Sequence, residues 1–147
     1  MPQKADIFKA LGDVDRLRII NLLLLKDFLC VCEMVHALKI PQYRLSKHLM
    51  LLKSLELVDV KKDGKWGYHY LIKESQTNRS LFEFLNKYLN DDTFQKDRNA
   101  LGLRLLLREG EKCVIGFAPE KEIKQLIRRK KKSHRGIAGS GSDNPSC

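Results

Sequence analysis

The apolar residues of the first 90 positions recur at helical spacing and divide into short helices. A first helix is expected to end before Gly12, and Asp13 can cap the start of a second helix. A third helix is expected over about residues 30–39. Pro41 follows the break after that helix and suits the first turn of a fourth, expected over about residues 41–55.

Alternating residues replace the helical pattern over about residues 58–71, with Asp63-Gly64 at the centre, which is a strong signal for a β-hairpin. A fifth helix is expected over about residues 78–89. Its apolar stripe is wide enough to pack against its own domain and a partner helix, and comprises Leu81, Phe82, Leu85, Tyr88 and Leu89. The predicted fold class is therefore mainly α with a β-hairpin (α+β).

The pattern weakens after residue 90. Further helices are expected at about residues 94–108 and 121–132, separated by a short apolar patch at residues 113–117. The Gly/Ser-rich stretch 136–147 is expected to be disordered. The resulting organisation is a domain over residues 1–90, an extension of uncertain structure over residues 91–118, and a basic, partly disordered tail over residues 119–147.

The charge balance indicates a polyanionic partner. The chain carries 28 Lys and Arg against 18 Asp and Glu, a formal net charge of +10, which favours nucleic acid or an anionic membrane. No run reaches the roughly 18 apolar residues that a membrane span needs, and the N-terminus lacks the apolar core of a signal peptide. A cytoplasmic location is therefore expected, where the four cysteines would be free thiols or ligands rather than disulfides.

Most of the excess positive charge lies in two zones. Residues 41–73 carry seven basic and three acidic side chains, and residues 119–147 carry eight basic and three acidic ones. The run 128–132 is either a solvated tail or a source of nonspecific DNA affinity, and the sequence favours neither interpretation.

Two short helices, a tight break, a basic-faced helix and a basic hairpin together predict a winged helix-turn-helix that reads DNA. The alternative is an ordinary α+β domain with a solvated basic helix. Because one such unit reads few base pairs, a symmetric dimer on a palindrome is expected. The candidate DNA-binding residues are Gln42, Tyr43, Arg44, Ser46, Lys47 and His48 on the fourth helix, and Lys61, Lys62 and Lys65 on the hairpin.

The sequence resembles the ArsR/SmtB family of metalloid- and metal-responsive repressors over about residues 5–90. The segments that carry the resemblance are Phe8–Ile19, Leu29–Glu33, Leu45–Leu52, Asp63–Trp66 and Tyr68–Leu71, which look like the family's opening helix pair, arsenic-sensing box, recognition helix and wing. The resemblance implies a homodimer joined through the first and fifth helices. It also implies a repressor whose DNA affinity falls when As(III) or Sb(III) binds.

The chain departs from the family pattern at the sensing box. Val35 occupies the position of the box's third cysteine. An N-terminal cysteine arm, which would suggest Cd(II) or Pb(II), is absent, and the fifth helix lacks the histidines of the family's zinc-type site.

Cys30 and Cys32 are the candidate ligands, at the start of the third helix. A helix N-terminus lowers a thiol pKa, and soft ions require thiolates. Residues two apart do not share a helix face, so one ion is expected to bind both only if the first turn distorts. Cys113 is a possible third ligand and His36 a possible Zn(II) or Cd(II) ligand, whereas Cys147 is a bystander. Each of these residues also has a simpler interpretation, as buried packing for the cysteines and as plain surface for His36.

No nucleophile–base pair, paired carboxylates or phosphate-binding loop stands out, so an enzyme is not expected. The predicted function is a repressor released from operator DNA by As(III) or Sb(III), with no organic cofactor. The alternatives are a thiol redox sensor, a Cd(II)- or Zn(II)-sensing regulator, and an interaction module that no longer binds DNA.

Overall fold

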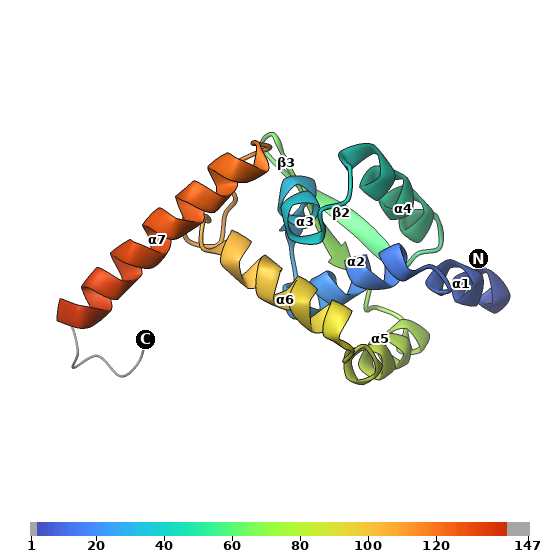
Figure 1. Cartoon of the computed structure of the whole chain (residues 1–147). Helices are drawn as coiled ribbons and strands as arrows, with labels where there is room; N and C mark the ends of the chain where they lie inside the picture. The colour runs from blue at the N-terminus through green and yellow to red at the C-terminus, as the bar shows by residue number, and fades with distance from the viewer. Residues whose placement is uncertain (1–2, 141–147) are drawn as a thin grey trace.

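A computed structural model of the chain describes residues 3–140, including the side chains of residues 3–133. Within this part, seven helices surround a small antiparallel sheet (Figure 1). The fold is α+β and has the winged helix-turn-helix arrangement that the sequence predicts. The elements in chain order are α1 (Lys4–Leu11), α2 (Val14–Leu25), β1 (Leu29–Cys30), α3 (Val31–Leu38), α4 (Gln42–Ser54), β2 (Val58–Asp63), β3 (Trp66–Leu71), α5 (Gln76–Tyr88), α6 (Asp92–Leu105) and α7 (Glu120–Ser140).

The boundaries of the first four helices follow local chemistry. The Asp13 carboxylate accepts hydrogen bonds from the backbone N–H groups of Asp15 at 2.8 Å and Arg16 at 3.2 Å, which caps α2 as expected. Lys39 adopts a left-handed conformation with φ 56° and ends α3. Pro41 is the residue before α4 rather than within its first turn.

The sheet has the strand order β1-β3-β2. The hairpin pairs Asp63 with Trp66 across a two-residue turn, and Gly64 takes φ +63° there, which glycine adopts without strain. β1 is a feature that the periodicity does not predict, because two residues carry no alternation. It pairs Cys30 with Tyr68 of β3, so Cys30 belongs to a strand and not to α3.

α6 packs against α2 and α3 and contributes Phe94 and Leu101 to the main core (Figure 1). The Arg18 guanidinium binds the Asp97 carboxylate at 2.7 Å and also donates to the Leu38 carbonyl at 3.0 Å. One side chain of α2 therefore holds both α6 and the end of α3. The side-chain amide of Asn21 donates a buried hydrogen bond of 3.0 Å to the Phe94 carbonyl.

A fully buried ion pair joins the residues after α6 to α3. The Arg108 guanidinium contacts the Glu33 carboxylate at 2.7 and 2.8 Å, and both side chains are less than 5% exposed. Glu33 also accepts the backbone N–H of Cys30 at 3.0 Å, and Arg108 donates to the Phe28 carbonyl at 2.6 Å. These bonds satisfy both charges, which is the condition for burying them.

The apolar stripe expected on α5 is divided in the structure between the protomer's own core and the protein surface. Phe82, Leu85 and Leu89 are buried in the protomer's own core, whereas Tyr88 is 65% exposed. Phe84, which the pattern does not single out, is exposed and stacks on Tyr88 with ring centroids 5.0 Å apart.

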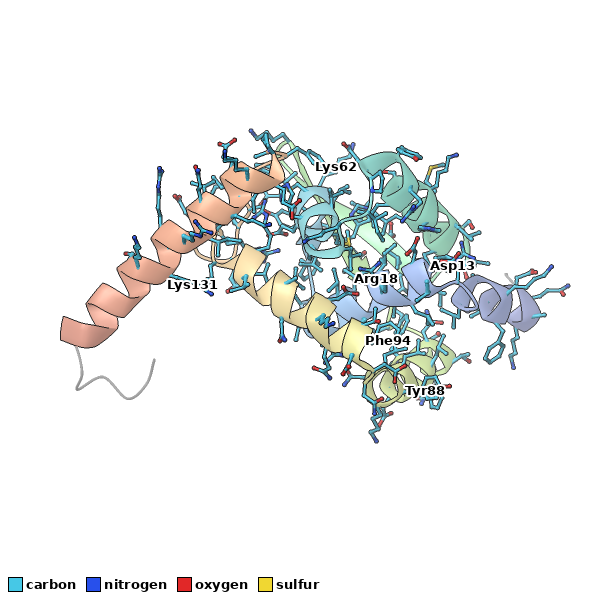
Figure 2. All side chains as sticks on the ribbon, viewed as in Figure 1. Asp13, Arg18, Lys62, Tyr88, Phe94 and Lys131 are labelled. Atoms are coloured by element: carbon cyan, nitrogen blue, oxygen red, sulfur yellow. The ribbon has the colours of Figure 1, made fainter. Side chains whose placement is uncertain are left out.

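α7 is longer than the expected helix and projects away from the body (Figure 1). It continues to Ser140, past the end expected at residue 132, and Figure 2 shows Lys131 along it. The stretch 141–147, including Cys147, lies outside the described residues. Among the described helices, none combines the length and apolar character that crossing a membrane requires.

We predict that Glu33→Gln lowers the free energy of unfolding by about 3–5 kcal/mol, because it leaves the Arg108 charge buried without its partner. Urea denaturation followed by far-UV circular dichroism measures this loss. Glu111→Gln is the control, because Glu111 forms an exposed ion pair with Lys26 and its loss should leave the urea midpoint nearly unchanged. A Glu33→Gln midpoint equal to that of the control would contradict the prediction.

Candidate functional site

α3 and α4 form the helix-turn-helix, and α4 presents its polar face outward. Leu45, Leu49 and Leu52 are buried on the inner face, as the helical spacing predicts. Gln42, Tyr43, Arg44 and Lys47 are exposed on the outer face and Ser46 is half-buried. The first two turns of α4 are therefore open to a nucleic acid.

His48 lies differently from the sequence expectation. Its side chain is 13% exposed and faces α2, where Nδ1 lies 3.2 Å from Arg16 Nη1 and Nε2 lies 3.7 Å from an Asp15 oxygen. The packing of α4 on α2 sets this direction. His48 is thus placed to fix α4 against α2 and not to reach a base.

Arg44 is held by an acidic side chain in the free protein. Its Nε lies 3.3 Å from Asp15 Oδ2, and Arg18 approaches the same carboxylate at 3.6 Å. Asp13, Asp15 and His48 bring their ligand atoms within 4.8 Å of one another. The guanidinium groups around these carboxylates already supply positive charge, so this cluster does not suit a cation.

The hairpin β2–β3 exposes the predicted lysines. Lys61, Lys62 and Lys65 are all exposed, and Figure 2 shows Lys62 near the tip. Lys65 Nζ lies 4.8 Å from the centroid of the Trp66 ring, which orients the turn. The acidic side chains of β2 are paired, with Asp63 to Lys112 at 3.4 Å and Asp59 to Lys53 at 3.7 Å.

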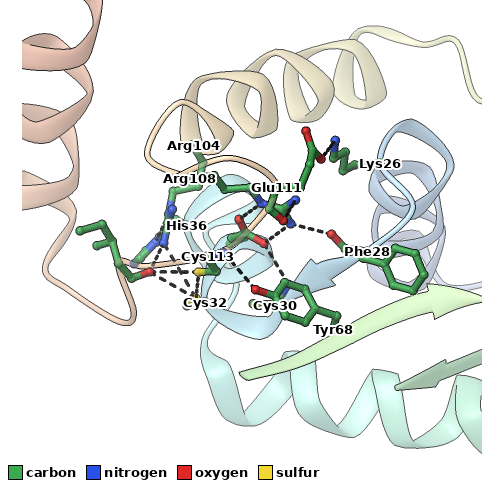
Figure 3. Close-up of polar contacts among 12 residues, drawn as sticks. Lys26, Phe28, Cys30, Cys32, His36, Tyr68, Arg104, Arg108, Glu111 and Cys113 are labelled. Atoms are coloured by element: carbon green, nitrogen blue, oxygen red, sulfur yellow. Dashed lines mark hydrogen bonds and ion pairs between the residues drawn. The ribbon is translucent and has the colours of Figure 1, made fainter. Parts of the chain in front are cut away.

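Three cysteines converge beside Tyr68 of β3 (Figure 3). The Sγ atoms of Cys30, Cys32 and Cys113 lie within 4.8 Å of one another, and those of Cys32 and Cys113 are 3.6 Å apart. Each residue is 2% exposed. We call these three residues the thiol cluster.

Cys30 and Cys32 converge without any unwinding of α3, contrary to the expectation from the sequence. Cys30 precedes the helix with extended φ −79° and ψ 155°, so its side chain is not bound by the helical spacing. Cys32 lies in the first turn. A distorted turn would be needed only if both cysteines were helical, and Cys30 is not.

The third thiol comes from the segment between α6 and α7, and its place is fixed by hydrogen bonds. The backbone N–H of Cys113 donates to the Tyr68 hydroxyl of β3 at 3.0 Å. Arg104 Nη2 donates to the Ile115 carbonyl at 2.7 Å and approaches Cys32 Sγ at 3.9 Å (Figure 3). Sequence spacing gives no sign of these contacts, because Cys113 is 81 residues from Cys32.

Hydrogen bonding within the thiol cluster favours the thiolate form of Cys113 over those of Cys30 and Cys32. Hydrogen bonds from the Cys30 and Cys32 thiols, together with the nearby Arg104 charge, lower the pKa of Cys113 to about 3. Hydrogen bonding to Cys113 raises the pKa of Cys32 to about 11. Cys30 also forms a hydrogen bond with Cys113, which raises the pKa of Cys30. The helix N-terminus therefore does not lower the pKa of Cys30 or Cys32, because mutual hydrogen bonding and burial outweigh it.

His36 lies near the thiol cluster but has other partners. Its Nδ1 accepts a hydrogen bond from Arg104 Nε at 2.8 Å, and its Nε2 lies 3.2 Å from the Ala118 carbonyl. Burial lowers the pKa of His36, with the Arg104 charge acting in the same direction. Both ring nitrogens are thus occupied, and His36 is not placed as a ligand.

Comparison with known proteins adds to this geometry. Residues 13–60 match the family model described as bacterial regulatory protein, arsR family. An uncharacterized HTH-type transcriptional regulator of Methanocaldococcus jannaschii is 41% identical over 70 residues, which cover 48% of this chain and 79% of that protein. The chain belongs to the ArsR family. An arsenical resistance operon repressor of Bacillus subtilis is 35% identical over 78 residues, which cover 53% of this chain and 73% of the relative.

A cadmium resistance transcriptional regulatory protein of Listeria innocua is 39% identical over 70 residues, with 48% of this chain and 59% of that protein covered. ArsR-family proteins are DNA-binding transcriptional regulators and not enzymes, so this chain is a transcriptional regulator with a DNA-binding helix-turn-helix domain. The family match ends at residue 60, and therefore it does not include Cys113, α6 or α7.

Proposed function

We propose that the chain is a cytoplasmic repressor that binds operator DNA as a homodimer and leaves it when As(III) or Sb(III) binds Cys30, Cys32 and Cys113. The single observation that carries this proposal is the convergence of three buried thiols within 4.8 Å. Thiolate sulfur is the ligand that soft ions prefer in proteins. The relatives named for arsenical and cadmium resistance support a metal-type inducer in general.

The composition of the thiol cluster favours a trivalent metalloid. Three thiolates balance the charge of a trivalent ion, and the described residues place no fourth Cys, His or carboxylate ligand within reach of the three sulfurs. With bonds of about 2.3 Å, as for zinc and sulfur, two sulfurs on one ion lie about 3.3–3.8 Å apart. The 3.6 Å between Cys32 and Cys113 falls in that range.

The position of the thiol cluster links it to both DNA-reading elements. Cys32 lies in the first turn of α3, which supports α4, and Cys30 pairs with Tyr68 in the hairpin. Drawing the three sulfurs onto one ion moves the segment carrying Cys113 relative to α3 and β3. We propose that this shift, rather than an unwound helix turn, disfavours the DNA-bound conformation.

A thiol redox sensor is the alternative that one observation favours. The Sγ atoms of Cys32 and Cys113 are 3.6 Å apart, close enough that an oxidant can drive a disulfide after a small movement. The two functions differ in their trigger, because the metalloid acts under reducing conditions.

α1 and α5 lie at the same end of the molecule (Figure 1), and the homodimer is proposed because both helices expose aromatic side chains. Phe8, Phe84 and Tyr88 are each more than half exposed. A second copy would cover them, and a two-fold dimer suits a palindromic operator.

We predict that Arg44→Ala and Lys47→Ala both weaken operator binding in fluorescence anisotropy. A base contact by Arg44 is worth about 1–3 kcal/mol at one position, so its loss should also relax specificity. A phosphate contact by Lys47 should lower the salt dependence by about one ion per subunit. Lys96→Ala is the matched control, because Lys96 is exposed on α6 and belongs neither to α4 nor to the proposed dimer surface. Unchanged binding in both α4 variants would show that α4 is not the recognition helix.

We predict that Cys30→Ser, Cys32→Ser and Cys113→Ser proteins still bind the operator but respond to As(III) only at much higher concentrations. Serine keeps the size of cysteine but offers a hard, protonated oxygen. The readout is anisotropy of labelled operator DNA titrated with As(III), Sb(III), Cd(II) and Zn(II) under a reductant, and with peroxide without it.

A full response to As(III) in all three variants would move the sensing site elsewhere. Release by peroxide alone, reversed by reductant, would favour the redox sensor. A normal response in Cys113→Ser alone would leave Cys30 and Cys32 as the only protein ligands.

We predict that Phe84→Glu converts the dimer to a monomer at micromolar concentration, because it places a charge in the proposed interface. Sedimentation velocity measures the change. Val114→Glu is the control, because Val114 is an exposed apolar residue in the segment that carries Cys113. A wild-type monomer under the same conditions would refute the dimer.

A further inference from the structure

The second half of α7 carries an uninterrupted run of cations, which are Arg128, Arg129, Lys130, Lys131 and Lys132. All five side chains are exposed. Among the side chains that the structure describes, no carboxylate forms an ion pair with any of them. We call residues 128–132 the basic arm. Neither the helix-turn-helix nor the thiol cluster gives these charges a role.

The basic arm is helical although its own charges oppose the helix. Residues three or four apart are neighbours on a helix, so Arg128 lies beside Lys131 and Lys132. Like charges at these spacings destabilise a helix. No side chain of the basic arm is buried against the body to offset this repulsion. A polyanion that lies along the arm would remove the repulsion and stabilise the helix.

The cations of the basic arm surround the helix axis rather than form a stripe. Consecutive residues are about 100° apart around a helix, so five of them cover the whole circumference. The apolar stripe of α7 ends before the arm, with Ile123 buried and Leu126 and Ile127 half-buried. A helix that lies on a membrane keeps an apolar face, which the basic arm lacks. The major groove of DNA has phosphates on both sides, and these suit a helix that is cationic all round.

The start of α7 is fixed beside both DNA-reading elements. Glu120 pairs with Lys39 at the end of α3 at 3.1 Å, and Lys112, in the segment that leads to α7, pairs with Asp63 of the hairpin at 3.4 Å. α7 then projects at the opposite end of the molecule from α1 and α5 (Figure 1). In a dimer joined through α1 and α5, the two basic arms are therefore the outermost parts, beyond the hairpins.

We propose that the basic arm binds the phosphates of the double-stranded DNA that flanks the operator, without reading its sequence. This rests on the proposed homodimer and on DNA binding by the helix-turn-helix, and it does not depend on the thiol cluster. α7 runs away from the hairpin, so the flanking duplex has to bend toward the arm (Figure 1). Neutralisation of phosphates by the arm offsets the cost of that bend.

Two double variants of the full-length protein test the role of the charges. Lys131→Gln/Lys132→Gln removes two charges per subunit from the basic arm, and glutamine has a helix propensity close to that of lysine. Lys73→Gln/Lys96→Gln is the matched control, because both lysines are exposed and lie outside α4, the hairpin and the proposed dimer surface. We call these proteins the arm variant and the control variant.

The probes are the operator duplex alone and the same duplex extended by unrelated sequence at each end. α7 is about 31 Å long, the length of about nine base pairs, so an extension of about ten base pairs on each side is sufficient. Fluorescence anisotropy over a series of KCl concentrations gives the affinity and its salt dependence. Energy transfer between dyes at the two ends of the extended duplex gives the bend.

On the extended duplex, the arm variant should lower the slope of log affinity against log salt by about 3–4 for the dimer, because four phosphate contacts are lost. The wild type and the control variant should gain about tenfold in affinity from the extension, whereas the arm variant should lose most of this gain and bend the duplex less. On the operator alone, the three proteins should bind alike.

Equal salt slopes for the arm and control variants on the extended duplex would overturn the proposal. An effect of the arm variant on vesicles of phosphatidylcholine and phosphatidylglycerol, with none on DNA, would also overturn it and assign the arm to a membrane surface. The slope difference should persist on a duplex of unrelated sequence and equal length, so the arm is tested even if the wild type shows no preference for the operator. Equal binding of the wild type to both duplexes would refute operator recognition and not the arm.

Discussion

The burial of charge between α3 and the end of α6 is the constraint on which the rest of the structure depends. Glu33 is fully buried and requires Arg108, and Arg108 can reach it only if α6 crosses α3 in the observed position. That crossing brings Arg104 beside His36 and carries the following residues to the hairpin. The family match does not include α6, yet α6 determines the surroundings of α3, the first helix of the helix-turn-helix.

The same constraint explains the electrostatics of the thiol cluster. Arg104 is enclosed by α3, α6 and the segment that follows α6, its Nη2 lies 3.9 Å from Cys32 Sγ, and its charge lowers the pKa of Cys113. Hydrogen bonding among the three thiols lowers the pKa of Cys113 and raises the pKa of Cys32. Binding a soft ion to three thiolates releases the protons that the thiols still hold, so affinity for such an ion rises with pH over the range where the thiols ionise.

Local chemistry made much of the fold predictable. Asp13 as a cap and Asp63-Gly64 as a turn act within a few residues, and the structure confirms both. The two residues of β1 are too few to show a period, and Cys30 was therefore assigned to the wrong element. The direction of His48 is set by α2, and the partner of Cys32 is set by α6. Neither contact has a signal in spacing, because each depends on how separate helices pack.

Under the proposed assignment, sensing and DNA reading lie on largely separate stretches of chain. α4 and the hairpin read the operator, whereas the third sulfur belongs to a short connection after α6. A lineage could therefore lose or relocate that one cysteine and acquire a different inducer while it keeps its set of target promoters. Related repressors that share α3 and α4 can in this way diverge in the stress they report without divergence in the genes they control.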